Sequence, residues 1–147
     1  MAGEKGNSNS AGWLGLIFQQ LVSGSLNTLV ANATTPLSTL YVSLHTADPT
    51  AAGTQSSNEA AYTGYTRIGV ARNSSGWSLS NETISNVGSI NFPLCTGGSE
   101  TETYFGIGTS LTGAGVLLYA GPLSSGLSVV NGITPSFAVG QLTITEG

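Results

Sequence analysis

The chain has 147 residues, of which 39% are hydrophobic and only 7% are charged, against roughly a quarter in an ordinary soluble domain. A net charge of −4 with three Lys and Arg residues excludes a surface that neutralises a run of nucleic-acid phosphates. The single cysteine, Cys95, excludes a disulfide within the chain. The length suits one domain with one hydrophobic core. Its weakly charged surface either touches neighbouring subunits or stays soluble through its many Ser and Thr residues.

An N-terminal arm and helix is expected over residues 1–31. Residues 1–10 are small and polar, and residues 11–31 have apolar side chains at the spacings of three and four that indicate a helix. These side chains are Leu14, Ile17, Phe18, Leu21, Val22, Leu29 and Val30. Ser10 is the expected N-cap, and Gly15 and Gly24 each weaken the helix by about 1 kcal/mol relative to Ala. The arm either covers one end of a β core or docks on a neighbouring subunit.

The beginning of the chain gives no sign of a membrane segment or an export signal. Polar residues interrupt the apolar stretch from Trp13 to Val30, which falls short of the roughly twenty apolar residues that span a bilayer. The charges of Glu4 and Lys5 cancel, whereas a signal peptide has a basic start. We therefore expect the protein to be made in the cytoplasm and used there or in a particle assembled there.

Residues 32–147 are expected to form a β-sandwich domain. Residues 39–45 alternate between apolar side chains and Tyr41, Ser43 and His45, which indicates a half-buried strand. A long polar loop, 49–61, follows it. Further short strands are expected at 62–71, 77–80, 87–92, 102–109, 116–120, 127–130, 133–139 and 142–145. Turn signals separate them, including a hairpin signal at Asn131-Gly132 and a loop at 122–126. The sequence thus predicts an all-β, antiparallel, jelly-roll-like sandwich with an N-terminal helical arm.

No catalytic or metal site is expected. Ser43, His45 and Asp48 lie too close in sequence for a Ser-His-acid triad, whose members come from different elements, and we interpret His45 as a surface or interface histidine. One His and one Cys do not make a metal site. Glu100 and Glu102 share a strand face, where a solvated edge is favoured over a cation site. We therefore predict no catalytic residue, no cofactor and no metal.

Several stretches of the chain together carry a resemblance to one protein family. Those near the opening strand are LYVSLHTADP (40–49), AGTQ (52–55), NE (58–59), YTGY (62–65) and Arg67. Later ones are NFP (91–93), CTGG (95–98), FGIGT (105–109), GAG (113–115), NGITP (131–135) and LTITE (142–146). They keep their order over nearly the whole chain after the first ten residues. In these stretches the chain resembles a family of small tailed-phage virion proteins often labelled phage tail fibre proteins. The resemblance implies a non-enzymatic structural protein of a phage virion.

Within such a virion, two roles are open. In the first, the chain is a capsid decoration (cement) protein that forms a homotrimer, bridges major capsid protein subunits and stabilises the assembled shell by binding it. In the second, it is a tail fibre or tail-tip protein that recognises a host-surface glycan through exposed tyrosines. The aromatic residues Tyr62, Tyr65, Trp77, Tyr104 and Tyr119 are otherwise expected as core and cross-strand pairs. The residues predicted to form interfaces are Trp13, Leu14, Ile17, Phe18, His45, Tyr62 and Tyr65.

Overall fold

The computed structural model describes residues 7–20 and 37–146, which divide into two compact units. The first, here called the helical unit, draws on residues 1–38, 71–89 and 137–147. The second, the sheet unit, draws on residues 39–70 and 90–136. Residues 1–6 and 21–31 of the predicted arm lie outside the described residues, so the division into an arm (1–31) and a sandwich domain (32–147) stays a prediction.

The helical unit packs one helix against a small sheet. Helix α1 (Asn7–Gln19) precedes the antiparallel strands β3 (Trp77–Ser80), β4 (Thr83–Asn86) and β9 (Thr143–Thr145), in the order β3-β4-β9. Leu14 and Phe18, four residues apart and therefore on one helix face, are fully buried. The Phe18 ring meets the buried Trp77 ring edge-on, with centroids 4.6 Å apart. This aromatic contact joins the helix to β3 and stabilises both.

Helix α1 begins earlier than the predicted helix and ends within its predicted range. The helix begins at Asn7, so Ser10 lies within it and the predicted N-cap is wrong. It ends at Gln19, because Gln20 has a left-handed backbone with a φ of 57°. The Arg72 guanidinium donates to the last helical carbonyls, those of Leu16 and Ile17, which favours this ending. The predicted helical residues Leu21, Val22, Gly24, Leu29 and Val30 lie outside the described residues.

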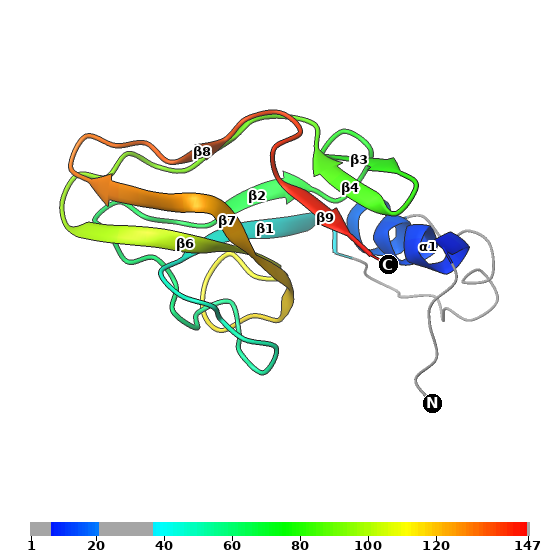
Figure 1. Cartoon of the computed structure of the whole chain (residues 1–147), viewed down its shortest axis with the longest axis horizontal. Coiled ribbons are helices and arrows are strands. Elements are labelled where there is room, and N and C mark those ends of the chain that lie inside the picture. Colours follow the sequence, from blue (N-terminus) through cyan, green and yellow to red (C-terminus); the bar gives the residue numbers. More distant parts are fainter. Residues whose placement is uncertain (1–6, 21–36, 147) are drawn as a thin grey trace. The chain divides into compact units, whose positions relative to one another are not determined.

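The sheet unit is built on a four-stranded sheet in the order β2-β1-β6-β7, shown in Figure 1. Its strands are β1 (Thr39–His45), β2 (Ile68–Ala71), β6 (Ser99–Gly108) and β7 (Leu117–Val130). Strand β1 pairs antiparallel with β6, and β6 pairs antiparallel with β7. The predicted strand at 39–45 is confirmed, but it is not half-buried. Leu40, Val42 and Leu44 are buried on one face, and Ser43 and His45 are equally buried on the other.

Strand β7 is longer than expected because it runs through the predicted loop at 122–126. Tyr104 pairs with Pro122 and Glu102 pairs with Leu127, so Thr103 alone lies opposite residues 123–126. The predicted loop is therefore a large bulge within one strand, with four residues opposite one. Pro122 is tolerated because β7 lies at the end of the strand order, where a missing N–H need not break a ladder.

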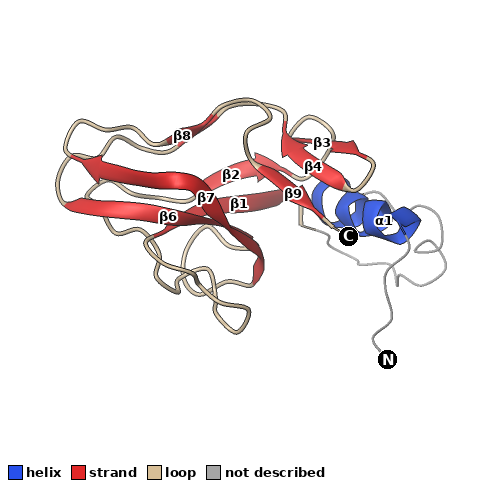
Figure 2. Ribbon diagram, viewed as in Figure 1, coloured by secondary structure: helices blue, strands red, loops and turns tan. Residues whose placement is uncertain are grey.

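The remaining strands are short. Strand β5 (Ile90–Asn91) pairs with β8 (Ser136–Phe137) in a two-stranded sheet. Gly132 has the positive φ of a tight turn, 92°, but β7 and β8 on its two sides belong to different sheets, so the predicted hairpin is wrong. As Figure 2 shows, the described chain is mostly β, with one short N-terminal helix. The prediction of a mostly β, antiparallel chain with an N-terminal helix is confirmed, whereas a jelly roll is not shown.

Candidate functional site

A buried ion pair lies at the base of two loops in the sheet unit. The Arg67 side chain is 2% exposed and the Glu59 side chain 16% exposed. Arg67 Nε donates to Glu59 Oε1 at 2.6 Å, and Arg67 Nη2 donates to Glu59 Oε2 at 2.7 Å. Such a two-pronged pair has a fixed geometry and retains its strength because little water screens it.

The same guanidinium reaches the loop between β6 and β7. Arg67 Nη1 donates to the Ser110 carbonyl at 2.8 Å, and Nη2 donates to the Gly113 carbonyl at 2.7 Å. The Arg67 guanidinium thus donates hydrogen bonds to both Glu59 carboxylate oxygens and to two backbone carbonyls. Its buried charge is therefore both paired and hydrogen-bonded. Arg67 therefore connects the segment that carries Glu59 to the loop that carries Ser110 and Gly113.

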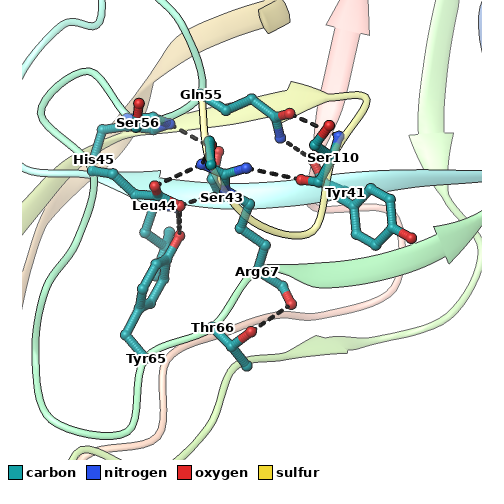
Figure 3. Close-up of polar contacts among 12 residues, drawn as sticks. Tyr41, Ser43, Leu44, His45, Gln55, Ser56, Tyr65, Thr66, Arg67 and Ser110 are labelled. Atoms are coloured by element: carbon teal, nitrogen blue, oxygen red, sulfur yellow. Dashed lines mark hydrogen bonds and ion pairs between the residues drawn. The ribbon is translucent and has the colours of Figure 1, made fainter. Parts of the chain in front are cut away.

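Gln55 makes a second connection between the two loops (Figure 3). Its backbone N–H donates to the Ala114 carbonyl, and its Oε1 accepts from the Ser110 N–H at 2.9 Å. Its Nε2 donates to the Tyr41 carbonyl of β1. A Cβ on Gly108 would lie 2.2 Å from the Gln55 side chain, so only glycine leaves room for it there. Gln55 and Arg67 together hold both loops against the sheet.

We call residues 50–58 and 109–116 the loop pair; the two segments are teal and yellow in Figure 1. Inside the loop pair, polar groups are hydrogen-bonded to Arg67 and Gln55. The side chains on its outside are exposed and uncharged. Leu111 is 47% exposed and Val116 60% exposed. The other exposed residues of the loop pair are Thr50, Ala51, Ala52, Ser56, Asn58, Thr112, Gly113 and Ala114. The arrangement presents apolar, hydroxyl and amide groups on a fixed base.

His45 lies inside the sheet unit, so the predicted surface histidine is wrong. It is fully buried, with Nδ1 2.8 Å from the Ser57 carbonyl and Nε2 2.8 Å from Ser43 Oγ. Because a carbonyl only accepts, Nδ1 carries the hydrogen and Nε2 accepts from the Ser43 hydroxyl. Burial lowers the His45 pKa and keeps the ring neutral.

The Ser43–His45 contact does not form an accessible active site. A Cβ on Gly106 would lie 2.5 Å from His45 Nε2 and 2.7 Å from Ser43 Oγ. The backbone of β6 therefore lies directly against both polar atoms. Asp48 lies apart from them, and its side chain accepts from the Thr50 N–H. Sequence reasoning correctly rejected a triad, although it missed the contact between the serine and the histidine.

Tyr62 is buried and Tyr65 is half-buried, so the prediction that both tyrosines are exposed is wrong. Tyr62 is 3% exposed and donates from its hydroxyl to the Pro93 carbonyl. The Tyr65 hydroxyl accepts from the Leu44 N–H and donates to Glu59 Oε1. Their rings meet edge-on, 5.4 Å apart. Tyr62 belongs to the core, as the alternative interpretation of the aromatic residues held, and Tyr65 packs against it.

The chain matches a family model described as podophage GP4 fiber I protein gp80 over residues 20–145. The chain belongs to this family. The resemblance drawn from the sequence is therefore confirmed, and the protein is a structural, non-enzymatic fibre protein of a phage virion. No curated protein matches the chain.

The family supports the fibre alternative better than the predicted capsid decoration role. Among the residues predicted to form interfaces in this fibre protein, Trp13 is 41% exposed and Ile17 is half-buried. Leu14 and Phe18 are in the core of the helical unit. The interface role of all seven residues, including His45, Tyr62 and Tyr65, stays a prediction.

Two further predictions concern ions and membranes. Glu102 is fully buried and Glu100 half-buried, so the predicted solvated edge is wrong. Within residues 7–20 and 37–146, no group of three or more His, Cys, Asp or Glu residues is placed to hold a metal ion. The helix described in this fibre protein is too short to cross a membrane.

Sequence reasoning did not find the Arg67–Glu59 pair or Gln55. The available signal was the scarcity of cations, because Arg67 is one of only three in the chain and comes directly before strand β2. A charge in such a place needs a buried partner. The sequence alone did not indicate which carboxylate supplies it.

Proposed function

We propose that this fibre protein takes part in recognition of the host surface and that the loop pair makes the contact. The observation that carries the proposal is the buried Arg67, which holds the Glu59 segment and the carbonyls of Ser110 and Gly113 at once. Loops held in this way bind a ligand with a smaller loss of conformational freedom than unsupported loops do. Exposed loops on a rigid sheet are also the usual location of binding residues.

The composition of the loop pair indicates the class of ligand. Arg67 is buried and its charge is balanced by Glu59, and the exposed residues of the loop pair carry no charge. Leu111 and Val116 provide apolar contact, while Thr112, Ser56 and Asn58 provide hydroxyl and amide groups. This set suits an uncharged sugar surface or an uncharged protein surface. Adsorption through it should depend only weakly on salt concentration, since screening acts on charges.

The test compares virions that carry variants of two exposed surfaces. In the first, Leu111→Ser and Val116→Ser remove the apolar contacts of the loop pair without disturbing Arg67 or Gln55. In the matched control, Val139→Ser changes a side chain of the helical unit that is 65% exposed. Immunoblots first establish equal amounts of the protein in each virion.

The proposal predicts that the loop variant adsorbs to host cells at least several-fold more slowly than wild type, while the control adsorbs normally. Equal adsorption of the loop variant and wild type would overturn it. The predicted homotrimer is a separate proposal, checked by the mass of the purified protein in light scattering.

A further inference from the structure

Glu102 is a buried acid on β6. It lies on β6, opposite Leu127 of β7, and its side chain is fully buried. Neither carboxyl oxygen has a hydrogen-bond partner in the part of the chain that the structure describes. An ionised carboxylate in such surroundings is costly, whereas a neutral carboxylic acid is tolerated. Burial of Glu102 therefore favours its neutral form over the carboxylate.

The neighbouring acid, Glu100, has a structural task. It lies two residues before Glu102 on the same face of β6. Its Oε1 accepts from the backbone N–H groups of Ala61 and Tyr62, both at 2.8 Å. These two bonds attach residues 59–63, which we call the strap, to β6. The strap also carries Glu59, the partner of Arg67.

The groups that face Glu102 offer no compensating positive charge. They are Glu100 on its own strand and the Tyr62 hydroxyl on the strap, which also interacts with the buried Cys95 thiol in the segment after β5. Arg67 is occupied by Glu59 and two carbonyls. Burial, followed by Glu100, raises the pKa of Glu102 to about 8. Burial, followed by Glu102, Cys95 and Glu100, raises the pKa of Tyr62 to about 12.

We propose that Glu102 is a proton-dependent lock on the strap. As the neutral acid, it lies beside Glu100 and leaves the two bonds to Ala61 and Tyr62 intact. When Glu102 gives its proton to hydroxide, two carboxylates face each other with no cation between them. Their repulsion, together with the demand of the new charge for water, drives Glu102 out of the core and detaches the strap from Glu100. Mildly alkaline conditions thus loosen the base of the loop pair.

The experiment is an NMR titration of the full chain with glutamate labelled at the side-chain carboxyl carbon, from pH 4 to pH 10. The proposal predicts one carboxyl resonance that titrates near pH 8, far above the ordinary range of about 4.3. The amide resonances of Ala61 and Tyr62 should shift with the same midpoint. In Glu102→Gln, the alkaline carboxyl titration disappears and both amides stay constant over that range.

The control is Glu82→Gln, which changes an acid of the helical unit and should leave the alkaline titration as in wild type. The proposal is overturned if every glutamate titrates in its ordinary acidic range. It is equally overturned if Glu102 titrates near pH 8 while the Ala61 and Tyr62 amides do not respond. Should Glu102→Gln fail to fold, the wild-type titration and its midpoints at Ala61 and Tyr62 still decide between these outcomes.

Discussion

Arg67 and Glu59 form an ion pair in the sheet unit, with two N–H···O bonds of 2.6 and 2.7 Å. The pair unites three segments far apart in sequence, because the guanidinium also donates to the Ser110 and Gly113 carbonyls. Although this fibre protein has few charged residues, two of them, Arg67 and Glu59, hold the exposed loop pair in place.

The first prediction concerns this pair. Arg67→Met leaves Glu59 without its cation and two loop carbonyls without donors, so the free energy of unfolding should fall by about 3–5 kcal/mol. Glu59→Gln should also be destabilising, because Arg67 then stays buried and unpaired. Urea denaturation measures both changes.

A double-mutant cycle separates the pair from its surroundings. Since the two side chains are in direct contact, the double variant should lose less stability than the sum of the single losses. Strictly additive losses would show that the ion pair contributes nothing of its own.

The second prediction concerns His45, the one histidine of the chain. Burial lowers its pKa in the folded state below the ordinary 6.5. As the pH falls below 6.5, the unfolded chain takes up a proton that the folded chain resists, so stability decreases, by at most about 1.4 kcal/mol per pH unit. Well above pH 6.5, His45 is neutral in both states and contributes no pH dependence.

The ring signals of this single histidine can be followed directly by proton NMR. They should titrate below pH 6.5 in the folded chain, and His45→Gln should lack the corresponding loss of stability in urea between pH 6.5 and pH 5.5. A midpoint at or above 6.5 would contradict the buried, neutral imidazole.

The third prediction concerns the close approach of β6 to the Ser43–His45 contact. Gly106→Ala places a Cβ within 2.7 Å of both polar atoms, so it should destabilise the chain by about 1–3 kcal/mol through overpacking. Gly88→Ala is the matched control, because a Cβ there meets nothing within 4 Å and its φ is not positive. Thermal unfolding compares the two variants, and equal melting temperatures would refute the tight contact.

The fourth prediction concerns the attachment of α1. Phe18→Ala removes a fully buried ring from its contact with Trp77 and should cost about 3–5 kcal/mol. Trp13→Ala, at a side chain 41% exposed, should cost much less. Urea unfolding followed by far-ultraviolet circular dichroism provides the measurement. If the two variants lost equal stability, the helix would not be held through its Leu14 and Phe18 face.

The local pattern of the chain predicted its strands better than their assembly. Strand β1 follows from the alternation of Leu40, Val42 and Leu44, and β3 follows from its flanking turns. The pattern missed the burial of Ser43 and His45, because polar residues at alternate positions indicate an exposed face unless a partner from a distant segment, here Ser57, satisfies them. Likewise, Pro122 indicates a loop, and only the position of β7 in the strand order explains why the strand continues.

The candidate site was less predictable because it depends on long-range contacts. Exposed tyrosines were a reasonable expectation for a recognition surface, but Tyr65 is turned inward by its bonds to Leu44 and Glu59. The loop pair itself is assembled by Gln55 and Arg67, which reach segments 43 to 59 residues away in sequence. Local sequence patterns do not encode such partners.

The most direct test of the account is to locate the loop pair on the intact virion. Antibody fragments raised against residues 109–116 and selected for binding to the folded chain would be added to virions and imaged by electron cryomicroscopy. The account predicts a small number of fragments on fibres at the tail, together with slower adsorption to host cells. Fragments spread in large numbers over the head would contradict it and restore the capsid decoration role.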